Sequence, residues 1–377
     1  MEAIIKKYIN ENKEGIVQLI KQLCEIPAPS HFEHERAQFC KKWLESNGAT
    51  GVTIDEAQNV VFPLHCENSN QITVFAAHTD TVFPDTEPMP YFDDGEKIYS
   101  PGVADDTASV SILLYMAKFF LSEKRLPPNG ILFVFNSCEE GLGNLKGTRQ
   151  IFKDYEGRIA NFISFDDNLN VVADRCVGSH RYEVEVITEG GHSYDAFGQE
   201  NAIAKLSEMI AKLYQIQVPV SPGTKTTYNV GTVLGGTSVN TIAQSAKMLC
   251  EYRSDDKDCL AMMRHEFQMI FESFASQTVQ VHVKKVGDRP CSNIESHKVE
   301  ALKKIVVPMM EKVLGQTISF RSSSTDCNIP LSLGIPALCI GVNLHHGIHT
   351  REEWVEKGSL SLGLELAIKL GIKVTEV

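Results

Sequence analysis

The sequence predicts an α/β fold in which a mostly parallel sheet, with helices on both faces, is interrupted by an inserted α+β unit. Two observations predict it. Short apolar runs alternate with helical patterns through most of the chain, and the usual outcome of that order is a parallel sheet between helices. Near residue 178 the order changes to β-α-β-β-α-β, the ferredoxin-like split motif on an antiparallel sheet. A chain of 377 residues is long enough for two or three domains.

The elements before the insert alternate in type. Helical spacing covers residues 2–23. Ser30 then stands three residues before Glu33, the spacing of a capping box, which predicts a helix running to about Ser46. Beyond it we expect strands over 72–77, 131–136 and 161–165, and a helix over 107–123.

The insert and the segment after it complete the pattern. In the insert we expect strands over 180–190, 226–236, 245–255 and 278–286, and helices over 200–216 and 259–275. The α/β order then resumes with helices over 296–314, after "TDCNIP" and over 358–371, and with strands near 318–320 and over 337–342. We therefore predict a discontinuous domain of residues 1–177 and 289–377, and an inserted domain of residues 178–288.

Charge and cysteine usage restrict the partners and the compartment. The net charge of −12, without a basic stripe, argues against nucleic acid and against an anionic membrane as partners. The ten cysteines contain no Cys-x-x-Cys pair, and the first residues show no signal-peptide pattern. No stretch approaches a transmembrane span. A cytoplasmic protein with reduced thiols is the simplest account.

Acidic and histidine side chains follow the expected strands, where the functional groups of open α/β sheets gather. They are His78 and Asp80 after 72–77, Glu139 and Glu140 after 131–136, Asp166 and Asp167 after 161–165, and His345, His346 and His349 after 337–342. Asp105 and Asp106 stand at a helix start. Each cluster alone would suit a solvated turn, but chance would rarely place such residues at every strand end.

These histidine and carboxylate side chains predict a metal site. Mixed imidazole and carboxylate ligands suit zinc, manganese or cobalt, and two close metals need a bridging carboxylate, for which Asp105 is the natural candidate. The side chains of Glu139 and Glu140 diverge because they are consecutive, so one can bind metal while the other acts as general base. Nucleophilic chemistry is poorly supported, because no G-x-S-x-G elbow is present and Cys138 more often would only pack.

Six ordered motifs carry a resemblance to a known family. "HTDTVFP", "SPGVADD", "EEGLGNLKGT", "ISFDD", "SSSTDCNIPLSLGIPAL" and "HTREEW" resemble the M20 family of cocatalytic metallopeptidases. That family includes glutamate carboxypeptidases, peptidase T, related dipeptidases and N-acyl amino acid deacylases. The resemblance covers essentially the whole chain. It implies a zinc exopeptidase-like catalytic domain with an inserted lid and dimerisation domain.

The resemblance implies roles for the strand-end residues. His78, Asp105, Glu140, Asp166 and His349 would bind two divalent ions, with Asp105 as the bridge, Asp80 behind His78 and Glu139 as general base. The family usually has a cis peptide bond after the bridging aspartate, a costly feature outside proline. Asp167 stays open as an alternative to Asp166, whereas His345 and His346 are expected bystanders.

In the insert, the resemblance singles out three residues. His192 matches an oxyanion-stabilising histidine that often acts across a dimer, and Asn240 and Arg253 match positions that contact the carboxylate or carbonyl of the substrate. The alternative for Arg253 is a surface salt bridge. Two departures, "SSSTD" in place of a glycine-rich stretch and "SCEEG" without the preceding aspartate or proline, remove no ligand.

The function expected from these residues is metal-dependent hydrolysis of a peptide bond in small peptides, of the di-/tripeptidase or carboxypeptidase type. A metal-activated water would attack, with Glu139 as its base. Zinc is the first choice, with manganese or cobalt as alternatives, and the protein is expected to form a homodimer through the lid. Two other functions stay open: deacylation of an N-acyl amino acid, and peptide binding by a homologue that has lost catalysis.

Overall fold

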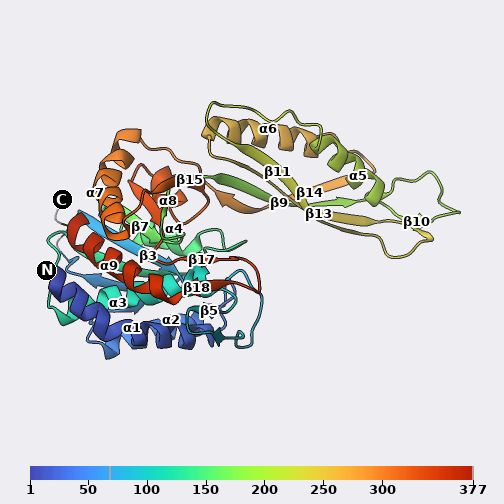
Figure 1. Ribbon diagram of the computed structural model, residues 1–377. Helices are drawn as coiled ribbons and strands as arrows, with labels where there is room; N and C mark the ends of the chain where they lie inside the picture. Colours follow the sequence, from blue (N-terminus) through green and yellow to red (C-terminus); the bar gives the residue numbers. More distant parts are fainter. Residues whose placement is uncertain (68, 376–377) are drawn as a thin grey trace. The chain divides into compact units, whose positions relative to one another are not determined.

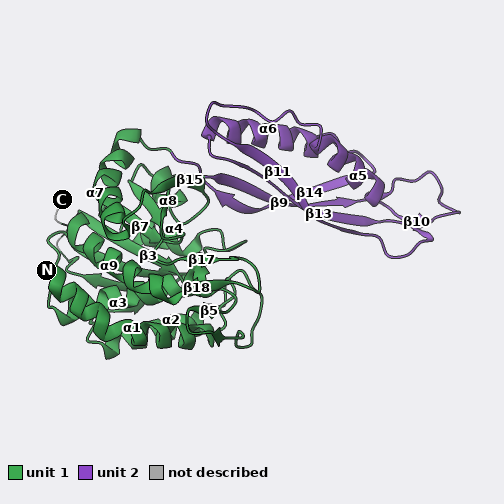
Figure 2. Ribbon diagram, viewed as in Figure 1, with its two compact units in different colours: residues 1–176, 293–377 green, residues 177–292 purple. Residues whose placement is uncertain are grey.

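The computed structural model describes residues 1–67 and 69–375, and the chain forms two compact units (Figures 1 and 2). The first unit consists of residues 1–176 and 293–377, and the second of residues 177–292. The insert expected at 178–288 lies inside the second unit. Among the described residues, no helix combines the length and the apolar character that crossing a membrane requires.

The first unit is built on an eight-stranded sheet in the order β1-β2-β6-β3-β7-β16-β8-β15. Its strands are β1 Thr53–Ile54, β2 Val60–Leu64, β3 Ile72–His78, β6 Ile131–Asn136, β7 Ile159–Phe165, β8 Val171–Cys176, β15 Ser319–Ser323 and β16 Ala337–Ile340. The central strands β6, β3, β7 and β16 run parallel, whereas β2 pairs antiparallel with β6 and β8 antiparallel with β16. The expected mostly parallel sheet is confirmed.

Helices cover this sheet. They are α1 Glu2–Cys24, α2 His34–Ser46, α3 Ala108–Ser122, α4 Lys146–Asp154, α7 Ser296–Leu314, α8 Asn328–Ser332 and α9 Lys357–Val374, with a short π-helix, η1 Val103–Thr107. Every residue of β3 and β6 is buried, so both faces of the centre of the sheet are covered. Helices α1, α3 and α7 contact α9, and α4 contacts α8 (Figure 1).

A small antiparallel sheet in the order β17-β18-β5-β4 joins two distant segments of this unit. Its strands are β4 Phe92–Asp93, β5 Lys97–Tyr99, β17 His345–His346 and β18 Trp354–Glu356. Strand β18 pairs with β5, so the segment that contains "HTREEW" lies beside the residues that lead to η1. Sequence patterns did not predict these strands, because they are only two or three residues long.

The predicted capping box at Ser30 and Glu33 is wrong. Helix α2 begins at His34, and no side chain caps it. The Ser30 hydroxyl instead donates to Asp80. The Glu33 carboxylate accepts the backbone N–H groups of His31 and Cys138. The spacing was that of a local cap, but both side chains bind groups that lie far away in the sequence: Ser30 binds Asp80, and Glu33 binds the backbone of Cys138.

The second unit is a four-stranded antiparallel sheet with two helices, and it has the predicted β-α-β-β-α-β order. Its elements are β9 Gly178–Ile187, α5 Ala202–Leu213, β11 Thr226–Gly235, β13 Ser245–Ser254, α6 Lys257–Ser273 and β14 Gln280–Arg289. The strand order is β11-β13-β9-β14, and both helices contact β9, β13 and each other. A two-stranded ribbon, β10 Gly191–His192 with β12 Thr241–Ile242, extends beyond them.

We expect Gly363→Ala to destabilise the first unit. A Cβ atom on Gly363 of α9 would lie 1.6 Å from the carbonyl oxygen of Val342, so the helix would have to move off the sheet. Overpacking of this kind costs about 1–3 kcal/mol, and thermal unfolding should show a lower midpoint. Gly358→Ala in the same helix is the control, since its Cβ would meet only Glu356 Oε1 at 3.5 Å. Equal midpoints for the two variants would contradict the packing described.

Candidate metal centre and active site

Two groups of side chains share one aspartate at the carboxyl edge of the main sheet. His78, Asp105 and Asp166 form the first group, and Asp105, Glu140 and His349 form the second; within each group the ligand atoms lie within 4.8 Å of one another. Asp105 Oδ1 lies 2.8 Å from His78 Nε2, and its Oδ2 lies 3.0 Å from His349 Nε2. The two oxygens therefore face different histidines, as a bridging carboxylate requires.

The strand order explains how residues from distant segments meet. His78 ends β3, Glu139 and Glu140 follow β6, and Asp166 follows β7, and these three strands are parallel neighbours. Parallel strands bring their carboxyl ends to one edge of the sheet. Glu139 also lies here, in a third group with His78 and Glu140.

Asp105 and His349 come from irregular backbone instead. Asp105 lies in η1 with non-helical φ −114° and ψ 86°. The expected cis peptide bond between Asp105 and Asp106 is present. His349 lies between β17 and β18 with a positive φ of 63°. Its Nε2 is 3.0 Å from Glu140 Oε1.

Asp80 holds both the first histidine and the glutamate pair. Its Oδ1 lies 3.4 Å from His78 Nδ1 and accepts the backbone N–H of Glu139 at 3.0 Å. Its Oδ2 accepts the N–H of Glu140 at 2.9 Å and the hydroxyl of Ser30 at 2.7 Å. Asp80 is completely buried. It therefore orients several groups at once, as carboxylates behind metal-ligating histidines commonly do.

The charged side chains of the site lie close enough to shift one another's pKa values. Burial, reinforced by the charge of Asp105, raises the pKa of Glu140 to about 7 and that of Asp166 well above its ordinary value. Hydrogen bonds to Asp105 and Glu140 raise the pKa of His349 to about 10. Burial opposes protonation of His78, but hydrogen bonds to Asp105 and Asp80 outweigh it and raise its pKa. This donor set of imidazoles and crowded carboxylates fits two divalent cations.

The structure places Asp166, and not Asp167, among the candidate metal ligands. Asp167 Oδ2 accepts a hydrogen bond from Arg321 at 2.8 Å, and Asp167 is in none of the three groups. His345 and His346 are also outside the groups: His345 Nδ1 lies 2.8 Å from Asn343 Oδ1, and the His346 ring packs near Trp354. Burial raises the pKa of the Cys138 thiol to about 12, which disfavours the thiolate that a nucleophile needs.

Sequence reasoning missed Glu353. Its side chain is completely buried, and it accepts hydrogen bonds from the backbone of the segment that contains Asp105. The motif "HTREEW" contains two glutamates, Glu352 and Glu353, and nothing local distinguishes the exposed one from the buried one. Only the pairing of β18 with β5 brings Glu353 to its partners.

The three residues singled out in the insert lie at two ends of its sheet. His192 is on β10, and its neighbour Ser193 donates a backbone N–H to the carbonyl of Asn240 at 3.0 Å. Arg253 lies near the other end of β13, opposite Ser179. Its Nε and Nη2 donate to the Glu251 carboxylate at 2.7 and 3.1 Å.

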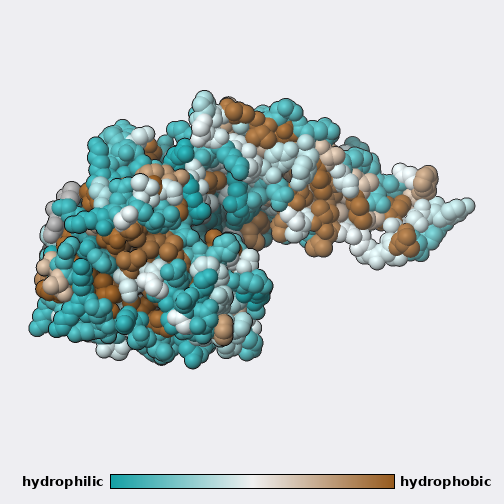
Figure 3. All heavy atoms as spheres, viewed as in Figure 1, coloured by the Kyte–Doolittle hydropathy of each residue, from teal (hydrophilic) through white to brown (hydrophobic). Residues whose placement is uncertain are grey.

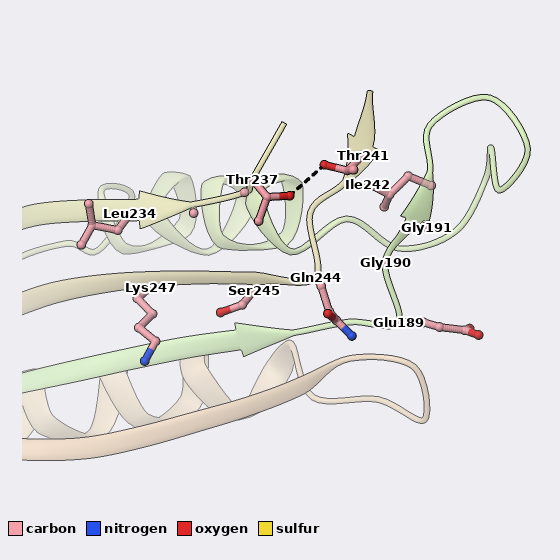
Figure 4. A pocket seen from close by; sticks show the side chains of 12 residues that line it. Glu189, Gly190, Gly191, Leu234, Thr237, Thr241, Ile242, Gln244, Ser245 and Lys247 are labelled. Atoms are coloured by element: carbon pink, nitrogen blue, oxygen red, sulfur yellow. Dashed lines mark hydrogen bonds between the residues drawn. The ribbon is translucent and has the colours of Figure 1, made fainter. Parts of the chain in front are cut away.

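A pocket of about 460 Å³ is lined by Gly191 and Thr241, the chain neighbours of His192 and Asn240, but not by His192 or Asn240 themselves (Figure 4). Gly190 and Gly191 line one side, Leu234 and Thr237 another, and Lys247 also contributes to the lining (Figure 4). The hydroxyls of Thr237 and Thr241 lie 3.2 Å apart. This end of the insert thus offers backbone and hydroxyl groups around a hollow, whereas the guanidinium of Arg253 is already paired.

Comparisons with known proteins agree with the motifs. The sequence profile of peptidase family M20/M25/M40 matches residues 74–371. A putative succinyl-diaminopimelate desuccinylase of Mycobacterium tuberculosis is 24% identical over 357 residues, which cover 93% of this chain and 96% of the relative. A peptidase M20 domain-containing protein of Schizosaccharomyces pombe is 28% identical over 244 residues, 62% of this chain and 59% of that protein. The chain thus spans little more than half of the yeast relative.

Solved structures share the whole fold. A tripeptidase from Staphylococcus aureus superposes with a TM-score of 0.78 at 22% identity, covering 97% of this chain and 99% of that chain. A dinuclear metal-binding peptidase of the M20 family from Bacillus subtilis has a TM-score of 0.68 at 14% identity, with coverage of 97% and 99%. Because these identities are low, the likeness shows that the chain shares the fold of these proteins and does not show a shared activity.

We expect Asp80→Asn to destabilise the metal-free protein by about 1–3 kcal/mol, because the amide nitrogen would face a buried N–H group that now has an acceptor. Ser30→Ala, which removes the hydroxyl that donates to Asp80 and, at 3.4 Å, to the carbonyl of Glu140, is the control, and it should cost about 1 kcal/mol. Denaturant unfolding in the presence of a chelator measures both. An Asp80→Asn variant no less stable than Ser30→Ala would show that Asp80 does not organise this turn.

Proposed function

Because the chain belongs to peptidase family M20/M25/M40 and is a hydrolase of peptide bonds, we propose that it is an exopeptidase that cleaves small peptides with two divalent metal ions. The observation that carries this proposal is the shared Asp105, whose two oxygens face His78 and His349. One aspartate common to two ligand groups is the arrangement that a pair of metals about 3.5–4 Å apart needs.

We assign the ligands from this geometry. His78 and Asp166 would hold one ion, Glu140 and His349 the other, and Asp105 both. Zinc is the proposed metal, since imidazole and carboxylate ligands suit it, and manganese or cobalt would fit the same donors. Bound there, the two cations would polarise the substrate carbonyl and lower the pKa of the attacking water.

Glu139 is the proposed general base. The Asp80 carboxylate accepts a hydrogen bond from the backbone N–H of Glu139 at 3.0 Å. The carboxylate of Glu139 lies within 4.8 Å of the ligand atoms of His78 and Glu140. It would accept a proton from the attacking water and return that proton to the leaving amine. Glu140, the next residue, has its Oε1 at His349 and is therefore suited to the ligand role.

The insert would act as the lid. We propose that His192 stabilises the oxyanion and that Asn240 and Arg253 contact the substrate. The pocket lined by Gly191 and Thr241, the chain neighbours of His192 and Asn240, supports a binding role for that end (Figure 4). The pairing of Arg253 with Glu251 means that a substrate carboxylate would have to displace Glu251 from the guanidinium.

The second candidate reaction is deacylation of an N-acyl amino acid at the same centre. The relative that supports it is the putative desuccinylase of Mycobacterium tuberculosis, because that match extends over 93% of this chain. Both reactions break a C–N bond next to a carbonyl group, so the residues assigned above would serve either. The groups that bind the acyl or peptide side chain decide between them.

A reducing compartment, and hence a cytoplasmic location, is supported by the cysteines. All ten thiols are buried, and none of them is joined in a disulfide. Buried thiols of this kind behave as small apolar side chains.

We also propose a homodimer through strand β11. This edge strand, "TTYNVGTVLG", contains no charged residue, and Val233 and Leu234 are 54% and 72% exposed. The other edge, β14, contains Lys284, Lys285 and Asp288. Charged side chains protect an edge strand from pairing, so only β14 is protected. Apolar patches on the second unit are visible in Figure 3, and pairing of β11 with β11 of a second copy would be isologous.

The first test is Glu139→Gln. We expect it to retain two metal ions per chain and to lose hydrolysis by about 10²–10⁴-fold, as removal of a general base does. Activity of both proteins is measured against dipeptides, tripeptides and N-acyl amino acids, with metal content determined on the same samples. Glu352→Gln, at an exposed position, is the control. Metal loading without turnover of any substrate by the wild type would contradict the catalytic proposal; the substrate turned over distinguishes peptidase from deacylase.

The dimer is tested by Leu234→Lys, which places a charge on the unprotected edge. We expect a dimeric wild type and a monomeric variant in size-exclusion chromatography with light scattering. Val283→Lys on β14, where Val283 is 43% exposed, should remain dimeric. A monomeric wild type, or a Leu234→Lys protein that stays dimeric, would exclude this interface.

A further inference from the structure

We propose that Glu353 is a positioning residue that holds the segment of Asp105 in register with that of His349, and so sets the affinity of the metal position they share. The inference rests on the proposed function, since it assumes that these residues bind metal. Glu353 Oε1 accepts the backbone N–H groups of Ala104 and Asp105 at 2.7 and 2.9 Å, and its Oε2 accepts that of Gly102 at 3.0 Å.

The backbone around Asp105 depends on this acceptor. The segment leaves Gly102 in the left-handed region, φ 72°, and passes through non-helical angles at Asp105, so it is part of neither a regular helix nor a strand ladder. Buried N–H groups without an acceptor cost about 1–3 kcal/mol each. One carboxylate satisfies three of them here, and all three point toward it. The direction in which the Asp105 side chain leaves the backbone is therefore tied to Glu353.

The backbone of Glu353 is held in place as well as its side chain. The backbone N–H of Ser100 donates to the carbonyl of Glu353 at 3.2 Å, and Trp354 pairs with Tyr99 between β18 and β5. Only three residues separate Glu353 from His349 in the chain. Glu353 thus connects, through side chain and main chain together, the two segments that contain Asp105 and His349.

Glu353 is not itself a candidate ligand. Both carboxylate oxygens already accept N–H groups, and Glu353 is in none of the three ligand groups. Residues that orient ligands from behind typically change metal affinity by about 10–100-fold when they are mutated. A purely structural residue would lower stability and leave the affinity of the folded protein unchanged. Metal affinity therefore distinguishes the two roles.

The experiment compares Glu353→Gln with Glu352→Gln, a matched control on the exposed neighbour. Zinc affinity is measured by competition with a chelator on metal-free protein at a temperature where unfolding is negligible, followed by kcat and KM at rising zinc. For Glu353→Gln we expect the zinc ion at Asp105, Glu140 and His349 to bind about 10–100-fold more weakly, and the other ion, which Asp105 also contacts in the proposed assignment, to be weakened by the same factor or less. The kcat of this variant should rise toward that of the wild type as zinc is added, with KM little changed.

Separate outcomes test the inference and the function. If Glu353→Gln binds two zinc ions with wild-type affinity, the positioning role is wrong and the proposed function stands. If the wild type does not bind two ions, the proposed function itself fails. Glu353→Asp, which keeps the charge but shortens the reach to the three N–H groups, covers the case in which Glu353→Gln does not fold. It should also lose affinity, and unchanged affinity would overturn the inference.

Discussion

The repulsion among buried acids is the constraint that the rest of the structure must meet. Four carboxylates share the three ligand groups with two histidines, and the ligand atoms within each group lie within 4.8 Å of one another. Burial and mutual repulsion raise the pKa values of Asp166 and Glu140. Such a cluster is unfavourable by itself, and bound divalent cations would offset the repulsion. Until they bind, only the surrounding structure keeps the ligands in place.

The chain meets this constraint by using the same device three times. A buried carboxylate accepts backbone N–H groups from three of the segments that contain candidate ligands: Asp80 for the segment of the glutamate pair, Asp106 for His78 at 3.0 Å, and Glu353 for the segment of Asp105. Hydrogen bonds of this kind fix the backbone and leave the ligand side chains free. Arg36, also buried, donates to main-chain carbonyls including that of Thr79, and it adds a positive charge beneath the site.

The sequence was sufficient where a rule acts locally or through strand order. Alternation identified the insert, and the strand-end rule grouped His78, Asp166 and the glutamate pair because β6, β3 and β7 are parallel neighbours. The strand-end rule named His345, His346 and His349 together, and only the resemblance selected His349 among them, since its loop has no regular pattern. Ser30 and Glu353 were misread or missed because their partners, Asp80 and Asp105, lie 50 and 248 residues away in the chain. No rule based on the spacing of residues predicts a contact between residues so far apart in the chain.

The length of the sheet in the insert ties the proposed substrate contacts to the proposed dimer. Along β13, Arg253 is eight residues from Ser245, about 26 Å at the rise of a strand, and Asn240 lies beyond that end. An extended tripeptide spans only about 10 Å. A small substrate therefore cannot contact Arg253 and Asn240 of one lid together. If all three assigned residues act on one substrate, two chains must contribute them, and the unprotected edge of β11 provides a surface through which a second chain can bind.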